Sequence, residues 1–135
     1  MDSKKGFTLI ESLVVIIIIS ILVAVVIPIM LGRIDSARWS EGKAIMGIIA
    51  RALRTHVAEY GNNFTPVPTL AQLGFEPGSL DGTYFSGGES GTNDFSWVIN
   101  SNNPVNFLIT ATAPAGINSP SQVTLNHAGI FTEIP

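Results

Sequence analysis

The feature that most constrains this chain is an uncharged apolar segment near its N-terminus. From Ser12 to Gly32 no residue carries a formal charge, and most side chains are isoleucine, valine or leucine. A helix rises about 1.5 Å per residue, so this segment would extend over about 30 Å, the thickness of the hydrocarbon core of a bilayer. The sequence therefore predicts a helix that can span a membrane.

Glu11 is a carboxylate in the first turns of this predicted helix, after Phe7, Leu9 and Ile10. An ionisable side chain in such a place usually has a partner or a function, because its desolvation is costly. Alternatively, Thr8 and Glu11 form a capping box, Thr-x-x-Glu, at a helix N-terminus near the lipid headgroups. The residues alone leave both interpretations open.

Residues 4–11 read Lys-Lys-Gly-Phe-Thr-Leu-Ile-Glu and precede the apolar helix. This arrangement resembles the N-terminus of type IV prepilins and type II secretion pseudopilins over about the first quarter of the chain. The resemblance implies that a prepilin peptidase cuts after Gly6 and methylates the new N-terminal residue, which would become a methylated phenylalanine at Phe7. It also implies that Glu11 pairs with the N-terminal amine of a neighbouring subunit in a filament.

Such a pairing is physically reasonable. Cleavage after Gly6 would leave a positive amine on Phe7 among apolar side chains, and a nearby anion lowers the cost of burying both charges. Within one helix, Phe7 and Glu11 are only about one turn apart, so an intramolecular pair competes with the intermolecular one.

Pro28 lies inside the apolar helix, where it removes a backbone hydrogen bond and crowds the preceding turn. Together with Gly32 it predicts a kink or local softening within residues 24–32. A passive kink is the alternative, because prolines are tolerated in membrane helices. The resemblance implies that the helix melts at this proline when subunits enter a filament, so Pro28 is a candidate assembly residue.

After Gly32 the pattern becomes amphipathic and predicts a stem helix over residues 33–61 with one buried face. Gly61 and the two asparagines after it form the stop signal. The residues of this face, which follow steps of three and four, are Ile45, Ile48, Ile49, Ala52, Leu53, His56, Val57 and Tyr60. The predicted organisation is a leader at 1–6, an assembly helix at 7–32, this stem and a head at 62–135.

The head is rich in turn residues and then in alternating patterns. Thr69 and Gln72 predict a second capping box, with a short helix at 70–73. Beyond it, alternation and turn signals predict four antiparallel strands at 95–100, 105–113, 122–126 and 129–134, with a turn at 127–129. The fold class expected is α+β, a long N-terminal helix packed on a small C-terminal antiparallel sheet, which agrees with the pilin-like fold that the resemblance implies.

Charge is distributed unevenly along the chain, whose formal net charge is −3. All the Lys and Arg residues lie at or before Arg54, and the charged residues after it are all Asp or Glu. A basic stem with an acidic head fits the packing of many copies, although an acidic surface without a partner is equally compatible. Nucleic-acid binding is disfavoured, because the stem's basic residues spread around the helix with Trp39 as the only interleaved aromatic. The chain has no cysteine, which departs from disulfide-bearing pilins.

The sequence holds no enzyme motif, and no cofactor is expected. Glu89, Asn93 and Asp94 offer oxygen donors suited to calcium. Their spacing does not match an EF-hand, and acidic glycine-rich loops are usually solvated turns, so they are weak metal candidates. They are considered because the resemblance implies calcium in a comparable head region. His56 is expected to be a hydrogen-bonded core or edge residue, and His127 a turn residue.

An ordinary secretory signal is disfavoured, because the apolar run is long and has no Ala-x-Ala site at its end. A retained anchor is expected, and the resemblance implies a single pass through the bacterial inner membrane with the head in the periplasm. The expected function is that of a structural subunit of a homo-oligomeric filament, a type II secretion pseudopilus or a type IV pilus, built by inner-membrane assembly machinery. The alternative is a bitopic membrane-anchored binding protein that does not polymerise.

Overall fold

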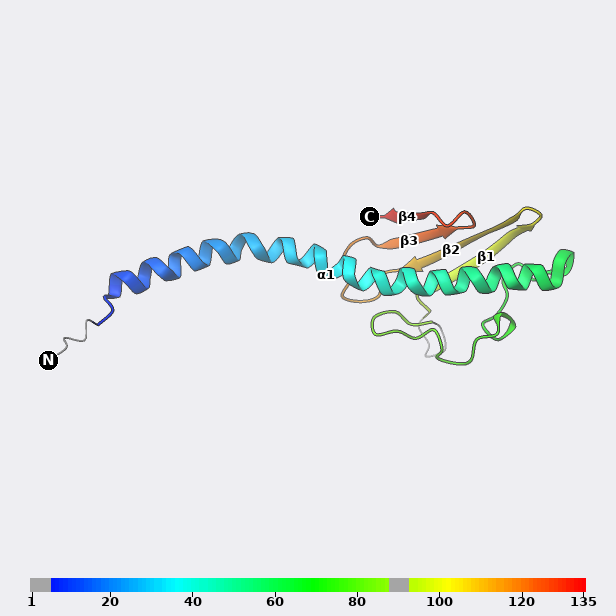
Figure 1. Cartoon of the computed structure of the whole chain (residues 1–135), viewed down its shortest axis with the longest axis horizontal. Helices are drawn as coiled ribbons and strands as arrows, with labels where there is room; N and C mark the ends of the chain where they lie inside the picture. The colour runs from blue at the N-terminus through cyan, green and yellow to red at the C-terminus, as the bar shows by residue number, and fades with distance from the viewer. Residues whose placement is uncertain (1–5, 88–92) are drawn as a thin grey trace. The chain divides into compact units, whose positions relative to one another are not determined.

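A computed structural model describes residues 6–87 and 93–135 of the chain. One long helix is followed by two short 3₁₀ helices and four strands (Figure 1). These elements are α1 (Leu9–Tyr60), η1 (Gly61–Asn63), η2 (Ala71–Leu73), β1 (Phe95–Asn102), β2 (Val105–Thr112), β3 (Gln122–Asn126) and β4 (Phe131–Ile134). The chain divides into two compact units, the first ending at Ile34 and the second comprising Asp35–Pro135.

In the first unit, α1 presents apolar side chains all around its surface. Every residue from Leu9 to Ile34 is exposed, and the helix is long and apolar enough to cross a membrane. Ser20 donates its hydroxyl hydrogen to the carbonyl oxygen of Ile16 at 2.7 Å, so its polar group is paired within the helix. The helix continues through Pro28. A proline removes a single helical hydrogen bond, and here that loss does not interrupt the helix.

In the second unit, α1 buries one face against the residues that follow it in the chain. Its buried side chains recur at steps of three and four, and Trp39, Met46 and Leu53 are almost completely enclosed. Ile48 and Tyr60 were predicted on this face, but they are exposed. Successive helical residues differ by about 100° around the axis. Ile48 is therefore turned by about 100° from the buried Ile49 and lies at the edge of the buried face of α1.

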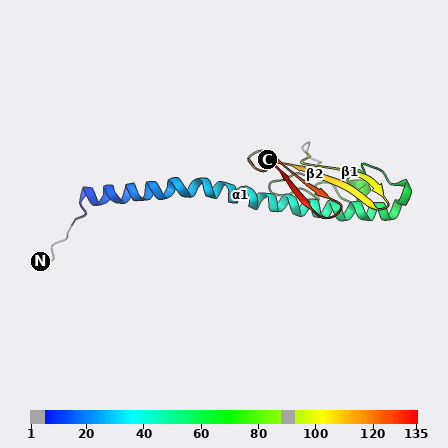
Figure 2. The same ribbon diagram turned by 90° about the horizontal axis from the view of Figure 1, so that it is seen from above.

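The strands form one antiparallel sheet in the order β1-β2-β3-β4. Phe95 pairs with Ala111, Ile109 with Leu125, and the buried residues of each strand alternate as the sequence predicts. These side chains share one core with the buried face of α1. Figure 2 shows the sheet lying alongside this part of the helix. The predicted α+β, pilin-like arrangement is therefore present.

The turn between β3 and β4 is longer than the sequence predicts, because β4 begins at Phe131. The side-chain oxygen of Asn126 accepts hydrogen bonds from the backbone N–H groups of Ala128 and Ile130, at 3.0 Å each. Gly129 has a φ of 82°, a conformation that glycine adopts without strain. As predicted, His127 is a turn residue.

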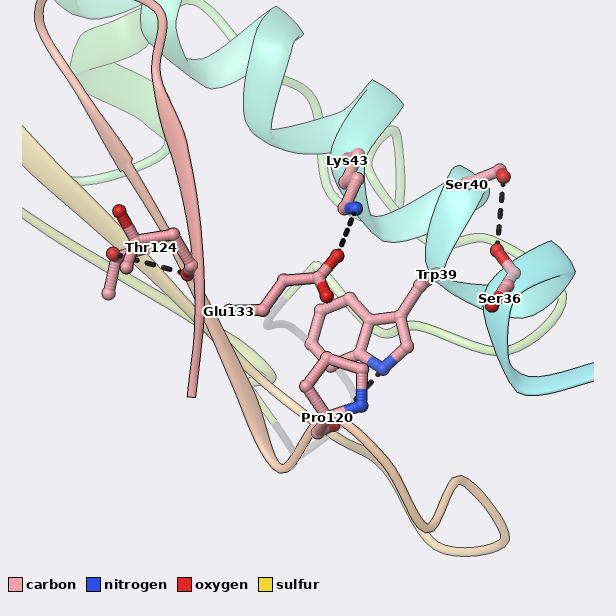
Figure 3. A network of polar contacts seen from close by, with 8 residues as sticks. Ser36, Trp39, Ser40, Lys43, Pro120, Thr124 and Glu133 are labelled. Carbon is pink, nitrogen blue, oxygen red and sulfur yellow. Dashed lines mark hydrogen bonds and ion pairs between the residues drawn. The ribbon is translucent and has the colours of Figure 1, made fainter. Parts of the chain in front are cut away.

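Polar contacts tie the sheet side of the head to α1. Trp39 Nε1 donates to the carbonyl oxygen of Pro120 at 3.1 Å, and Lys43 Nζ lies 2.6 Å from Glu133 Oε1 (Figure 3). Arg54 donates to the carbonyl oxygen of His127, and Arg38 to that of Gly116. Three of the stem's basic side chains therefore serve contacts within the head.

Candidate functional site

The predicted cleavage position precedes α1. Gly6, Phe7 and Thr8 have no regular secondary structure, and Phe7 is 82% exposed. A side chain added at Gly6 would meet no atom within 4 Å. Among the residues that the structure describes, no packing contact therefore requires glycine at this position.

Glu11 forms the predicted capping box with Thr8. Glu11 Oε2 accepts hydrogen bonds from the backbone N–H of Thr8 at 2.9 Å and from its hydroxyl at 2.7 Å. In return, Thr8 Oγ1 lies 3.3 Å from the backbone nitrogen of Glu11, which donates to it. Among the described residues, the cap occupies one carboxylate oxygen of Glu11, and Oε1 has no hydrogen-bond partner.

The head contains the same device with a neutral residue. Gln72 Oε1 accepts a hydrogen bond from the backbone N–H of Thr69 at 2.8 Å, and the Gln72 backbone nitrogen donates to Thr69 Oγ1 at 3.3 Å. These lengths match those at Thr8 and Glu11 within about 0.1 Å. An uncharged amide can therefore close a capping box, although the carboxylate of Glu11 accepts one further hydrogen bond, from the Thr8 hydroxyl. Capping explains the length and acceptor of the Glu11 side chain, but it does not require its negative charge.

The surroundings of Glu11 are apolar and open. A depression of about 380 Å³ is lined by Glu11 together with Phe7, Ile10, Val14 and Val15. Glu11 supplies the only charge among these residues. The depression can accept an apolar side chain that also carries a cationic group, because the carboxylate then faces a charge of opposite sign. Pro28 lies 17 positions further along α1 and takes no part in this depression.

The predicted metal candidates are partly engaged in backbone contacts. Asn93 Oδ1 accepts a hydrogen bond from the backbone N–H of Phe95 at 2.9 Å, and Asp94 Oδ2 accepts one from Ser86 at 2.7 Å. Glu89 lies outside the described residues. Within residues 6–87 and 93–135, no group of three or more His, Cys, Asp or Glu side chains is placed to hold a metal ion.

Glu41 is a structural site that sequence reasoning missed. Its Oε1 accepts hydrogen bonds from the backbone N–H groups of Tyr84 at 2.8 Å and Phe85 at 3.0 Å, and so fixes the loop before β1 on α1. Burial of the carboxyl raises the pKa of Glu41, but the N–H groups of Thr83, Tyr84 and Phe85 together outweigh burial, so the pKa lies below its ordinary value.

Two glycines allow this loop to approach the helix closely. A Cβ added at Gly82 would overlap the Glu41 side chain, meeting its Cδ at 2.6 Å. A Cβ added at Gly42 would lie 2.8 Å from Cζ of Phe85. The Phe85 ring also packs on Trp39, with 5.0 Å between ring centroids. Glycine at both positions therefore makes room for the contact between loop and helix.

His56 differs from its expected state. It is buried as predicted, with 3% of its surface exposed. However, neither ring nitrogen has a hydrogen-bond partner in the part of the chain that the structure describes. The expectation of a hydrogen-bonded core histidine is therefore wrong. The helical pattern places the ring in the core, but it carries no information about which acceptors or donors the rest of the head brings near it.

Comparison with known families gives one match, which covers residues 1–27 and is described as the prokaryotic N-terminal methylation motif. The comparison with curated proteins found no match. The search of solved structures found none either. The matched segment includes Gly6, Phe7 and Glu11, and the family that carries this motif is structural rather than enzymatic. With its apolar helix and its α+β head, the chain carries the prepilin-type signature, which supports its place in the type IV pilin and pseudopilin family.

Proposed function

We propose that this protein is a structural subunit of a type IV-like filament, a type II secretion pseudopilus or a type IV pilus. In this proposal the prepilin peptidase cuts after Gly6, Phe7 is methylated, and the subunit waits in the inner membrane with its head in the periplasm. Inner-membrane machinery then packs the apolar helices of many copies side by side. Glu11 of one copy pairs with the N-terminal amine of the next.

The observation that carries this proposal is the negative charge of Glu11, which the capping box does not need. Thr69 and Gln72 close an equivalent box with a neutral amide. The helix macrodipole favours an anion at this end only weakly, whereas an unpaired charge is costly to desolvate when apolar helices pack around it. Attraction to a cationic group of another subunit would offset this cost and would give the charge of Glu11 a function.

Two further observations support the same pairing. The cap uses Glu11 Oε2, so Oε1 remains for an additional donor among the described residues. The depression beside Glu11 is lined by apolar side chains and suits the phenylalanine that would carry the new amine. Apolar helices have little preference among axial registers, so one desolvated ion pair can select a single register.

Intact-mass spectrometry of the protein from its native cell tests the processing step. The mature chain should begin at Phe7, lack residues 1–6 and carry one additional methyl group. An uncut chain that begins at Met1 would contradict the filament proposal and would favour the alternative, a bitopic anchor that does not polymerise. That alternative is supported by the hydrogen bonds that Glu11 makes within its own chain.

Glu11→Gln tests the assembly step. Glutamine can keep the cap, as Gln72 does, but it removes the charge. Breaking one partner of a buried ion pair costs about 3–5 kcal/mol, so the recovered filament fraction should fall by more than about a hundredfold. Gln72→Glu is the matched control, because it makes the reverse change in the head and should leave assembly unchanged. Wild-type filament yield from Glu11→Gln with normal processing would overturn the pairing.

A further inference from the structure

The head part of α1 has a second face that the described residues leave uncovered. Arg51 lies on it, two residues before the buried Leu53, so the helix turns it by about 200° to nearly the opposite side from the core. The exposed, uncharged residues that follow the same steps of three and four are Ala37, Ser40, Ala44, Ile48, Thr55 and Ala58, with Ile48 at the boundary with the buried face. These residues and Arg51 form the outer stem face.

Two opposite charges on this side of the stem have no partner within their own chain. Most of the described charged side chains of the head do have one, as Lys43 has in Glu133 at 2.6 Å. Arg51 and Glu59 are exposed, and their side chains make no hydrogen bond or ion pair with residues 6–87 and 93–135. The stem therefore offers one free positive and one free negative group.

Arg51 and Glu59 cannot pair with each other inside one helix. Eight residues separate them, which is about 12 Å along the axis and about 80° around it. Ion pairs within a helix form between residues three or four apart, at about 5–6 Å. The two charges therefore lie on neighbouring sides of the stem. A contact that repeats from copy to copy joins two different surfaces of the same molecule, so a positive side and a negative side suit such a contact.

The axial register of the proposed filament brings these two charges closer together. If the amine of Phe7 in one copy lies level with Glu11 of its neighbour, the two copies are offset by four residues, or about 6 Å. In a helical assembly one axial offset applies to every residue of the subunit. Arg51 of the first copy then lies level with Thr55 of the neighbour. Its distance along the axis from the neighbour's Glu59 falls from about 12 Å to about 6 Å, the spacing of ion pairs one turn apart.

We propose that the outer stem face packs on the stem of a second copy, and that Arg51 of one copy pairs with Glu59 of the next. This inference rests on the proposed filament function and adds a second ion pair, far along the stem from Glu11. The small side chains of the outer stem face allow two helices to approach closely. A second stem would also cover Ile48, which its own chain leaves 40% exposed.

Charge reversal tests this pair in filaments recovered from the native cell. Arg51→Glu would bring two carboxylates together and Glu59→Arg two guanidinium groups, so each variant should lower the recovered filament fraction by about tenfold. The double variant Arg51→Glu, Glu59→Arg exchanges the charges and should restore the wild-type fraction. Glu76→Arg is the matched control, because it makes the same change of charge at an exposed glutamate outside α1, and it should leave the fraction unchanged.

Each variant should be cut after Gly6 and should unfold at the same urea concentration as the wild-type protein, because neither side chain has a partner in its own chain. Wild-type yield from either single variant would overturn the pair. A double variant as impaired as the single ones would also overturn it and would show that this face contacts a different partner. If Glu11→Gln prevents assembly while both reversals are harmless, the stem contact alone is rejected. An uncut wild-type chain would reject the filament and the stem contact together.

Discussion

The two parts of α1 belong to one helix but differ in what their side chains contact. From Leu9 to Ile34 every residue is exposed, whereas from Asp35 onward buried residues recur along one face. The first part has no charged residue between Ser12 and Gly32, whereas the second part carries acidic and basic residues among its apolar ones. The first part of α1 buries none of its side chains against the rest of the chain, so its apolar surface remains exposed. The second part holds the head together.

Two leucines provide the sharpest test of this difference. Leu53 is fully buried and Leu22 is 61% exposed. Leu53→Ala should lower the free energy of unfolding of the head by about 2–5 kcal/mol, because it removes core contacts and leaves a cavity. Leu22→Ala should not change it. Urea unfolding followed by tryptophan emission in micelles measures the head alone, since Trp39 and Trp97 both lie in the second unit. Equal losses of unfolding free energy in Leu53→Ala and Leu22→Ala would contradict the difference between the two parts of α1.

Two glycines test how tightly the second part of α1 is packed. A Cβ at Gly42 would crowd the Phe85 ring, so Gly42→Ala should destabilise the head by about 1–3 kcal/mol. A Cβ at Gly47 would meet no atom within 4 Å. Gly47→Ala should therefore stabilise the helix by up to about 1 kcal/mol through its better helix propensity. The same unfolding assay measures both variants, and a Gly42→Ala variant as stable as the wild-type protein would show that Phe85 does not pack on Gly42 in solution.

Glu41 makes the stability of the head depend on pH. Its pKa is lowered in the folded state, chiefly because backbone N–H groups outweigh the opposing effect of burial. The contribution of this contact to stability is therefore fully present above the ordinary glutamate pKa, and it is lost as pH falls from there through the lower pKa of the folded state. Glu41→Gln should cost about 1 kcal/mol at pH 7, because the side chain is half-exposed and solvent weakens its bonds.

The pH dependence of unfolding separates this effect from a general loss of stability. In the Glu41→Gln variant, the difference from the wild-type protein should shrink as pH falls through that window. Glu76→Gln is the control, because Glu76 is exposed and its side chain makes no hydrogen bond or ion pair within residues 6–87 and 93–135. A difference that stays constant from pH 7 to pH 3 would argue against the carboxylate contact.

Metal removal should have the smallest effect. Asn93 and Asp94 each use a side-chain oxygen to accept a backbone hydrogen bond, so they can fix the loop before β1 without an ion. We therefore expect that a calcium chelator leaves the Tm of the head unchanged. A lower Tm with chelator, restored by added calcium, would contradict this expectation and show that the head binds calcium.

Features set by neighbouring residues could be predicted from the sequence. The two capping boxes join residues three positions apart, and their residue types alone specify both hydrogen bonds. The strands were predictable because apolar residues recur at every second position, as Phe107, Ile109 and Ala111 do in β2, which indicates a sheet with one buried face. The N-terminal motif was also local, since its residues occur within a few positions of one another.

Features that join distant segments could not be predicted in this way. Glu41 contacts a loop more than 40 residues further along the chain. Asp35 accepts a hydrogen bond from Asn118, 83 positions away. Each is one acid on an amphipathic helix, and nothing in its neighbourhood distinguishes it from a solvated charge. The unpaired state of His56 has the same origin, because it depends on which side chains the loops bring beside the ring.

The close approach of Gly82 to Glu41 links the evolution of two distant positions. Because the Glu41 carboxylate occupies the space of a side chain at 82, any larger residue there would require a shorter acid or a different residue at 41. In homologous chains the two positions should change together, and a Gly82→Ala variant should regain lost stability when combined with Glu41→Asp. Covariation of positions 41 and 82 would indicate that the loop contacts α1 in the same way in homologues whose other loop residues differ.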